Sequence, residues 1–234
     1  MTPAASSAAA PEERARPLLI AHRFGNEIAL VREADAAGVD LIEIDVWRHR
    51  GRLEVRHLKT LGPIPLLWDR WRLASALTPR LLLHRLVQET SPATELMLDL
   101  KGGDRALPGA VITTMQAELP GHRYWVCSQS WTLLEQFRDV PDVRVVHSVG
   151  DERMLRQVAR RLTWHDDHAI SINRQLLDPD RVRRLREQVP TLMTWAVNTR
   201  AEADRLVAWG VNGLISDDLD LLRQLAGAGP GPAA

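Results

Sequence analysis

Eight short apolar segments recur along this chain, and most of them precede a segment with the apolar spacing of an amphipathic helix. Apolar residues at i, i+3, i+4 and i+7 form one face of a helix, as at Met154, Leu155 and Val158. Short apolar runs without polar alternation are typical of strands buried on both faces, as in parallel sheets. The eight runs are Leu18–Ala21, Leu41–Val46, Leu96–Leu100, Tyr124–Cys127, Val143–Val146, Ala169–Ile172, Leu192–Val197 and Val211–Ile215.

Strands that alternate with helices predict a parallel sheet, and eight of them favour a closed (β/α)₈ barrel, or TIM barrel, over an open sheet. The chain has 234 residues, which suits one barrel domain, and we predict that this domain spans residues 18–226. Residues 1–17 and 227–234 are rich in Ala, Pro and Gly, and we expect both ends to be disordered. The pairs Asp178-Pro179 and Asp217-Asp218 are predicted to cap helices.

The alternation of strand and helix is interrupted after the second run. The segment Trp47–His57 has a polar turn around Arg50 and Gly51 followed by alternating residues, which predicts a β-hairpin extension. Antiparallel pairing about this turn brings His57 opposite residue 44 or 45. We therefore expect His57 to lie beside Glu43 and Asp45 at the end of the second strand.

Residues 58–94 are predicted to form an insertion above the C-terminal rim of the barrel, before the third strand. Its tryptophans Trp68 and Trp71 have the i, i+3 spacing of a helix, and the favoured interpretation is that they pack a helix over residues 70–90 onto the barrel. The alternative is contact with an acyl chain or a membrane interface, which leaves transient membrane contact open. We predict no transmembrane segment, because no stretch approaches 18 consecutive apolar residues.

The charge composition argues against a general nucleic-acid binder, because 30 Lys and Arg balance 30 Asp and Glu without a contiguous basic run. Only two of these cations are lysines, Lys59 and Lys101.

The single Cys127 has no intrachain disulfide partner, and the N-terminal residues lack the apolar core of a signal peptide. Both observations favour a cytoplasmic location. The oligomeric state stays open.

Three carboxylates follow the predicted strands. Glu43 and Asp45 are two residues apart on one strand and therefore share a face, which in a barrel is the interior near the rim. Asp99, at the end of the next run, adds a third oxygen donor. Close carboxylates raise each other's pKa unless a cation lies between them, and a hard cation such as Mg²⁺ or Ca²⁺ prefers oxygen ligands. The alternative is that rim arginines pair with Glu43 and Asp45, and that Asp99 forms a local ion pair with Lys101.

Basic side chains lie at the ends of the same strands. His22 and Arg23 end the first run, and Lys101 shares a face with Asp99. A guanidinium binds phosphate through two parallel hydrogen bonds, while an imidazole exchanges protons near neutral pH. Two histidines, a bound cation and these basic groups are the equipment for phosphodiester cleavage. The alternative for His22 is a structural histidine.

Five motifs in this order resemble the glycerophosphodiester phosphodiesterase family. Three lie near the N-terminus, namely Ile20-Ala21-His22-Arg23, the segment Ala37–Val46, and Val55-Arg56-His57. Two lie near the C-terminus, Thr194–Asn198 and Gly210–Asp217. The resemblance extends from about Leu18 to Leu225.

The resemblance implies a TIM barrel of the phospholipase-C-like type that hydrolyses glycerophosphodiesters to an alcohol and glycerol 3-phosphate with one divalent cation. In this family the neighbouring glycerol hydroxyl commonly attacks phosphorus, and water then opens the cyclic phosphate. By motif match, the implied roles are acid–base catalysis for His22 and His57, phosphate binding for Arg23, and metal binding for Glu43, Asp45 and Asp99. Lys101 is expected to face the phosphate, and Trp195 to wall the substrate pocket.

Three departures from the family pattern bear on the substrate. The first loop is contracted to Phe24–Glu27, which retains Asn26 and loses a family Glu. Leu58 follows the second histidine where the family has Asp. The motif Asp99-Leu100-Lys101 replaces Glu-x-Lys and resembles the sphingomyelinase D and phospholipase D toxins. Two alternatives follow: a phospholipase D-like enzyme that releases a cyclic phosphate from lysophospholipids, and a barrel that binds phosphorylated ligands without turnover.

Overall fold

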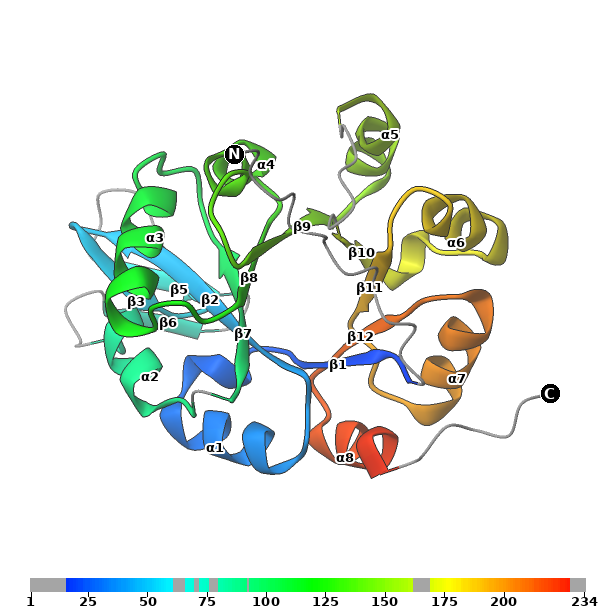
Figure 1. Cartoon of the computed structure of the whole chain (residues 1–234), viewed down its shortest axis with the longest axis horizontal. Coiled ribbons are helices and arrows are strands. Elements are labelled where there is room, and N and C mark those ends of the chain that lie inside the picture. The colour runs from blue at the N-terminus through cyan, green and yellow to red at the C-terminus, as the bar shows by residue number, and fades with distance from the viewer. Residues whose placement is uncertain are drawn as a thin grey trace, which may run out of the picture.

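The computed structural model describes residues 16–60, 66–69, 72–75, 80–91, 93–161 and 169–227. Eight parallel strands form a closed ring, because the first strand pairs with both the second and the last (Figure 1). In order around the ring, the strands are β1 (Leu18–Ala21), β2 (Leu41–His49), β7 (Glu95–Leu100), β8 (Tyr124–Ser128), β9 (Val143–Val149), β10 (Ala169–Asn173), β11 (Thr191–Trp195) and β12 (Gly213–Ser216).

Helices surround this ring on the outside (Figure 1). They are α1 (Ile28–Ala36), α2 (Leu83–Glu89), α3 (Leu107–Glu118), α4 (Trp131–Leu134), α5 (Glu152–Arg161), α6 (Pro179–Arg186), α7 (Arg200–Trp209) and α8 (Leu219–Gly227). The predicted TIM barrel is therefore confirmed, and all eight apolar runs are strands of the ring.

The apolar runs are buried on both faces, as the sequence predicted. Side chains that point into the barrel, such as Ile20, Met97 and Ile215, form one core cluster. Their neighbours on the opposite face pack against the helices in two further clusters. The predicted caps are also present, since Asp178 Oδ1 accepts a hydrogen bond from the first turn of α6 and Asp218 Oδ1 accepts one from Leu221 N.

The predicted hairpin is confirmed. Strand β3 (Arg52–Val55) pairs antiparallel with β2, with Val46 opposite Val55. The two turn residues, Arg50 and Gly51, have φ angles of 48° and 78°, as a two-residue type I′ turn requires. Arg56 N then donates to Asp45 O at 3.0 Å, which extends the pairing up to the neighbour of His57.

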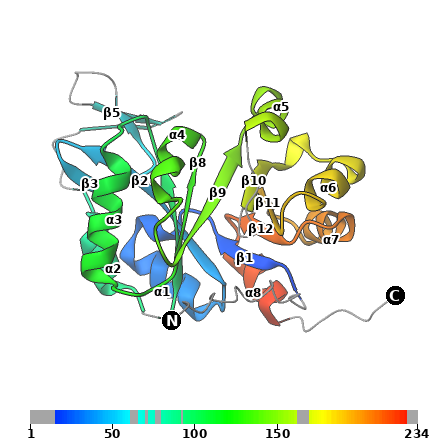
Figure 2. The same cartoon turned by 45° about the horizontal axis from the view of Figure 1, so that its top comes forward.

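The insertion differs from the prediction. Strands β4 (Lys59–Thr60), β5 (Leu66–Asp69) and β6 (Arg72–Ser75) form a small antiparallel sheet, seen beyond β2 and β3 in Figure 2, so the helix predicted over residues 70–90 is wrong. Among the residues of this stretch that the structure describes, only those of α2 are helical. Cross-strand pairing of Trp68 with Lys59 and Leu73 overrides the local helical spacing. Trp68 is 42% exposed and so does not pack a helix onto the barrel; Trp71 lies outside the described residues.

The two chain ends lie mostly outside the described residues. Of the segment 1–17, the structure describes Arg16 and Pro17, and Arg16 Nη1 donates to Asp40 Oδ2 at 2.5 Å. The last described residue, Gly227, ends α8. Within the described ranges, no helix has both the length and the apolar character needed to cross a membrane.

Two neighbouring residues of α7 test how the helices dock onto the ring. Leu206 is 1% exposed, whereas Val207 is 38% exposed. We predict that Leu206→Ala lowers the free energy of unfolding by about 2–5 kcal/mol, because it leaves a cavity under the helix. Val207→Ala, the matched control, should change it by less than about 0.5 kcal/mol. Urea denaturation followed by circular dichroism measures both, and equal effects would contradict the docking of α7.

Candidate active site

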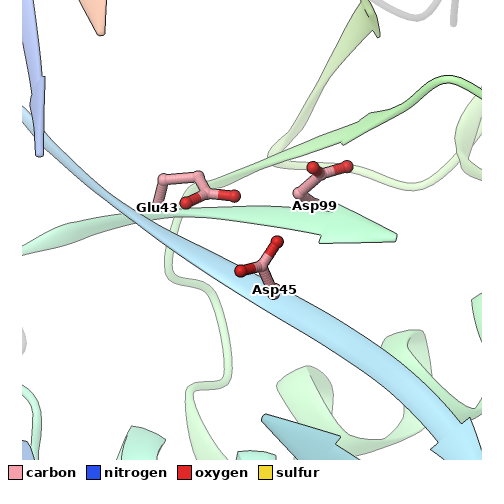
Figure 3. Close-up of side chains that lie close together, drawn as sticks. All are labelled: Glu43, Asp45 and Asp99. Carbon is pink, nitrogen blue, oxygen red and sulfur yellow. The ribbon is translucent and has the colours of Figure 1, made fainter. Parts of the chain in front are cut away.

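Three carboxylates meet inside the barrel near the C-terminal ends of its strands (Figure 3). Glu43 and Asp45 project from β2, and Asp99 projects from β7 at the register position opposite Asp45. One carboxylate oxygen of each lies within 4.8 Å of the others. Glu43 is 2% exposed and Asp45 is fully buried, so at least two of the three carboxylates are shielded from water. The predicted acidic constellation therefore exists.

Asp45 contacts side chains from three other segments of the site. Its Oδ2 accepts from Asn26 Nδ2 at 2.7 Å and lies 3.2 Å from His57 Nδ1, and its Oδ1 lies 2.8 Å from Lys101 Nζ. Burial raises the pKa of Asp45, but the hydrogen bond with His57 and the charge of Lys101 outweigh it and hold the pKa well below its usual range. Asp45 is therefore an ionised carboxylate at neutral pH.

The contracted first loop carries Asn26 to this position. Residues Phe24–Asn26 form a single 3₁₀ turn, and Asn26 both donates to the Asp45 carboxylate and accepts from Asp45 N at 2.9 Å. Gly25 allows the turn to lie against β2, because a Cβ at this position would be 2.2 Å from Ile44 Cγ1. The shortened loop thus retains a side chain that fixes the central carboxylate.

Glu43 lies deeper in the barrel, and its neighbours offset its negative charge less than the neighbours of Asp45 do. Its Oε2 accepts a hydrogen bond from Arg23 N at 2.6 Å, with Arg23 in the left-handed conformation at φ 63°. Burial and the charge of Asp45 raise the pKa of Glu43 to about 8. A cation bound between the carboxylates would favour the ionised form.

Lys101 bridges two of the carboxylates. Its ammonium forms ion pairs with Asp45 and Asp99. Burial lowers the pKa of Lys101, but the charges of Asp99 and Asp45 outweigh it and raise the pKa above its usual value. The ion pair considered as an alternative for Asp99 and Lys101 is thus present. Three carboxylates and one ammonium leave an excess of negative charge among oxygen donors, which fits a divalent hard cation.

His22, at the end of β1, has its own carboxylate partner. His22 Nδ1 lies 2.7 Å from Asp217 Oδ1, and Asn198 Nδ2 donates to Asp217 Oδ2 at 3.3 Å. Burial lowers the pKa of His22, but the hydrogen bond to Asp217 and the charge of Glu43 outweigh it, so the pKa is raised. Sequence reasoning treated Asp217 only as a cap. Its place two residues after the inward-facing Ile215 was the signal that could have found it.

The remaining predicted residues lie at the edge of the site. The Arg23 side chain is 42% exposed, and its Nε is 3.9 Å from Asp45 Oδ2. Trp195 ends β11, is half-buried, and packs against the apolar cluster inside the barrel. The structure therefore brings all eight predicted site residues to one end of the barrel, as their strand-end positions predicted.

Two open cavities differ in their relation to these residues. A groove of about 610 Å³ is lined by Phe24, Asn198 and Asp217 together with residues of α1 and α8, so it begins beside the His22–Asp217 pair. A second cavity of about 630 Å³ lies between the hairpin, α2 and α3 and contains none of the predicted site residues. Of these two, only the first adjoins the catalytic candidates.

Comparisons with known proteins give one family match and several similar folds. Residues 121–221 match the glycerophosphoryl diester phosphodiesterase family. No curated protein matches the chain. The fold is similar to an Oleispira antarctica phosphodiesterase in complex with the product sn-glycerol-3-phosphate, with a TM-score of 0.73 and 16% identity, covering 91% of this chain and 98% of that one.

Two further solved structures have the same fold. A glycerophosphodiester phosphodiesterase from Thermotoga maritima has a TM-score of 0.69 and 16% identity, covering 90% of this chain and 98% of that chain. One from Parabacteroides distasonis has a TM-score of 0.66 and 17% identity, again covering 90% and 98%. The matched residues 121–221 begin after the segment that contains the acidic cluster and both histidines.

The raised pKa of Glu43 predicts how stability changes with pH in the cation-free protein. The pKa of Glu43 is about 8 in the folded protein against an ordinary value of 4.5, so the folded state holds a proton that the unfolded state releases. Its stabilising contribution is complete below about pH 4.5 and is lost as the pH rises towards 8. Melting temperatures measured in EDTA should therefore fall between pH 5 and pH 8.

Glu43→Gln should flatten this dependence, because an amide does not titrate. Glu33→Gln, on the exposed face of α1, is the matched control and should retain the slope of the unmodified protein. A slope as steep in Glu43→Gln as in Glu33→Gln would show that Glu43 is already ionised when no cation is bound.

Proposed function

We propose that this chain, whose residues 121–221 match the glycerophosphoryl diester phosphodiesterase family, hydrolyses glycerophosphodiesters to an alcohol and glycerol 3-phosphate by metal-assisted histidine catalysis. It is accordingly a phosphoric diester hydrolase. One observation carries the catalytic part of the proposal. Two imidazoles, each hydrogen-bonded to a carboxylate through Nδ1, accompany a cluster of three carboxylates on the same rim.

The carboxylates Glu43, Asp45 and Asp99 would hold the divalent cation, Mg²⁺ or Ca²⁺. When bound there, such a cation neutralises the charge that develops on the phosphate oxygens. Arg23 and Lys101 supply further positive charge at the edge of the same site, and phosphate oxygens accept hydrogen bonds from both kinds of side chain.

The histidine contacts determine which ring nitrogen faces the substrate. A carboxylate that is ionised accepts hydrogen bonds and does not donate them, so Nδ1 of His22 carries a proton towards Asp217, and Nδ1 of His57 carries one towards Asp45. In each neutral ring Nε2 is then the proton acceptor. The two Nε2 atoms are therefore the ring nitrogens that would exchange protons with the substrate.

We infer the following chemistry from these groups. The glycerol hydroxyl next to the ester attacks phosphorus and gives its proton to Nε2 of one histidine. The bond from phosphorus to the leaving alcohol breaks, and the other histidine, protonated on both nitrogens, donates a proton to the departing oxygen. Water then attacks phosphorus and gives its proton to the second histidine. The bond from phosphorus to the glycerol oxygen that had attacked breaks, and the first histidine protonates this oxygen, which yields glycerol 3-phosphate and returns both histidines to their starting protonation states.

Residues next to the histidines and carboxylates would enclose the rest of the substrate. Trp195 would wall the substrate pocket, and the groove beside Asp217 offers space for the alcohol portion of the diester.

The single Cys127 is buried, and burial raises the pKa of its thiol. A thiol in this protonated form resists oxidation. We propose a cytoplasmic location because the single cysteine of the chain has no intrachain disulfide partner.

A lysophospholipid reaction remains the second candidate, because the Asp99–Lys101 ion pair corresponds to the motif that resembles the phospholipase D toxins. ³¹P NMR separates the candidates. The purified protein is incubated with glycerophosphocholine or lysophosphatidylcholine, each with Mg²⁺, Ca²⁺ or EDTA. Linear glycerol 3-phosphate supports the proposal, a lipid cyclic phosphate supports the second candidate, and no turnover with any metal contradicts both and supports a binding barrel.

The two imidazoles should be separately essential. We predict that His22→Ala and His57→Ala each lower kcat by about 10²- to 10⁴-fold, because each removes one proton-transfer group. Thermal stabilisation by Mg²⁺ or Ca²⁺ should persist in both variants, since the carboxylates remain. His84→Ala, on α2, is the control and should retain full activity. A fully active His57→Ala variant would remove the acid–base assignment.

Asp217 should determine the protonation of His22. Burial lowers the pKa of His22 and the hydrogen bond to Asp217 raises it, so Asp217→Asn should shift the His22 limb of the pH–rate profile to lower pH. The variant should also lose at least about tenfold in kcat, because the imidazole is no longer oriented by a charged acceptor. A profile that keeps its position would show that Asp217 acts only as a structural residue.

A further inference from the structure

The second histidine lies in a short connection between β3 and β4, so its position depends on what holds that connection. In this chain Leu58 follows His57, and a leucine side chain offers no hydrogen bond. We propose that Arg56 is a positioning residue that fixes the backbone on both sides of His57. This inference rests on the proposed function, since it assumes that His57 transfers protons.

Arg56 is a buried cation that contacts residues on both sides of it in the chain. Its side chain is 3% exposed, and its Nε donates to Glu54 Oε2 at 2.7 Å. Its Nη1 donates to Leu58 O. The guanidinium also stacks over the ring of Trp47, with Cζ 4.8 Å from the ring centroid. A charge buried to this extent is costly unless it is paired and hydrogen-bonded, and here both conditions are met.

The contacts of Arg56 bracket His57 along the chain. On one side, Arg56 N donates to Asp45 O at 3.0 Å and ties the segment to β2. On the other side, the Arg56 side chain holds the carbonyl of Leu58. With both neighbours fixed, the His57 ring is directed towards Asp45, whose Oδ2 is 3.2 Å from Nδ1.

The stack on Trp47 extends this support to β7. Gly102 lies against the six-membered part of the Trp47 ring, since a Cβ there would be 3.1 Å from Trp47 Cζ3, and its φ of 80° also disfavours any other residue. Gly102 directly follows Lys101. The contacts of Trp47 with Arg56 and Gly102 therefore connect the segment that carries His57 to the strand end that carries Asp99 and Lys101.

An arginine suits this position because its planar fork reaches two acceptors in different directions at once. The Nε atom contacts the Glu54 carboxylate while Nη1 contacts the Leu58 carbonyl. A lysine ammonium at the same place would retain a charge opposite Glu54 but lacks the second arm. The replacement Arg56→Lys therefore tests the effect of the charge separately from the effect of the second hydrogen bond.

Kinetics of three variants test the proposal. Arg56→Met should lower kcat on the glycerophosphodiester by about 10- to 100-fold with KM changed less than about threefold, because a displaced imidazole transfers protons poorly but leaves the phosphate contacts intact. Arg56→Lys should recover only part of this loss. Arg52→Met, an exposed arginine in the same hairpin, is the matched control and should behave as the unmodified protein.

Imidazole ¹H–¹⁵N NMR supplies a readout that does not depend on turnover. The His57 signals, assigned by their loss in His57→Ala, should shift or broaden in Arg56→Met, while those of His22 stay unchanged. If Arg56→Met fails to fold, Glu54→Gln takes its place, with a smaller loss of kcat and the same selective change at His57.

Three results would overturn the proposal. Unchanged kcat together with unchanged His57 signals would show that Arg56 does not position the ring. Equal changes at His22 and His57 would indicate a general loss of structure, and full recovery by Arg56→Lys would show that charge alone matters. If the unmodified protein has no phosphodiesterase activity, the proposed function fails, whereas the His57 signals still decide whether Arg56 fixes that side chain.

Discussion

The site depends on one buried carboxylate, that of Asp45. It accepts a hydrogen bond from Asn26, pairs with Lys101 and contacts His57, and so joins three segments that are distant in sequence. A buried charge without partners is unstable, and removing one partner of a buried pair costs about 3–5 kcal/mol. The same groups that make the burial of Asp45 possible are therefore held in place by it, including the proposed catalytic imidazole.

Much of the fold and the acidic cluster follows from residue order alone. Continuous apolar runs predict buried parallel strands, and the period of two along a strand turns Glu43 and Asp45 to one face. The turn at Arg50 and Gly51 fixes the hairpin register, which returns His57 to Asp45. These predictions succeeded because each rests on local periodicity or on symmetry about a short turn.

Contacts between separate segments were harder to predict. The pairing of Trp68 with Lys59 and Leu73 forms a sheet where helical spacing predicted a helix, because strand pairing depends on partners elsewhere in the chain. Asp217 approaches His22 only when the last strand closes the ring against the first. Loop composition likewise did not show how Asn26 would reach the central carboxylate.

The central claim is that the carboxylate cluster and the two imidazoles act on one phosphate. A crystal structure grown with Ca²⁺ and glycerol 3-phosphate tests it most directly. The account predicts a cation coordinated by Glu43, Asp45 and Asp99, with the phosphate within hydrogen-bond reach of Nε2 of His22 and His57. A phosphate bound elsewhere, or a cation held by other residues while Lys101 keeps its place between Asp45 and Asp99, would contradict it.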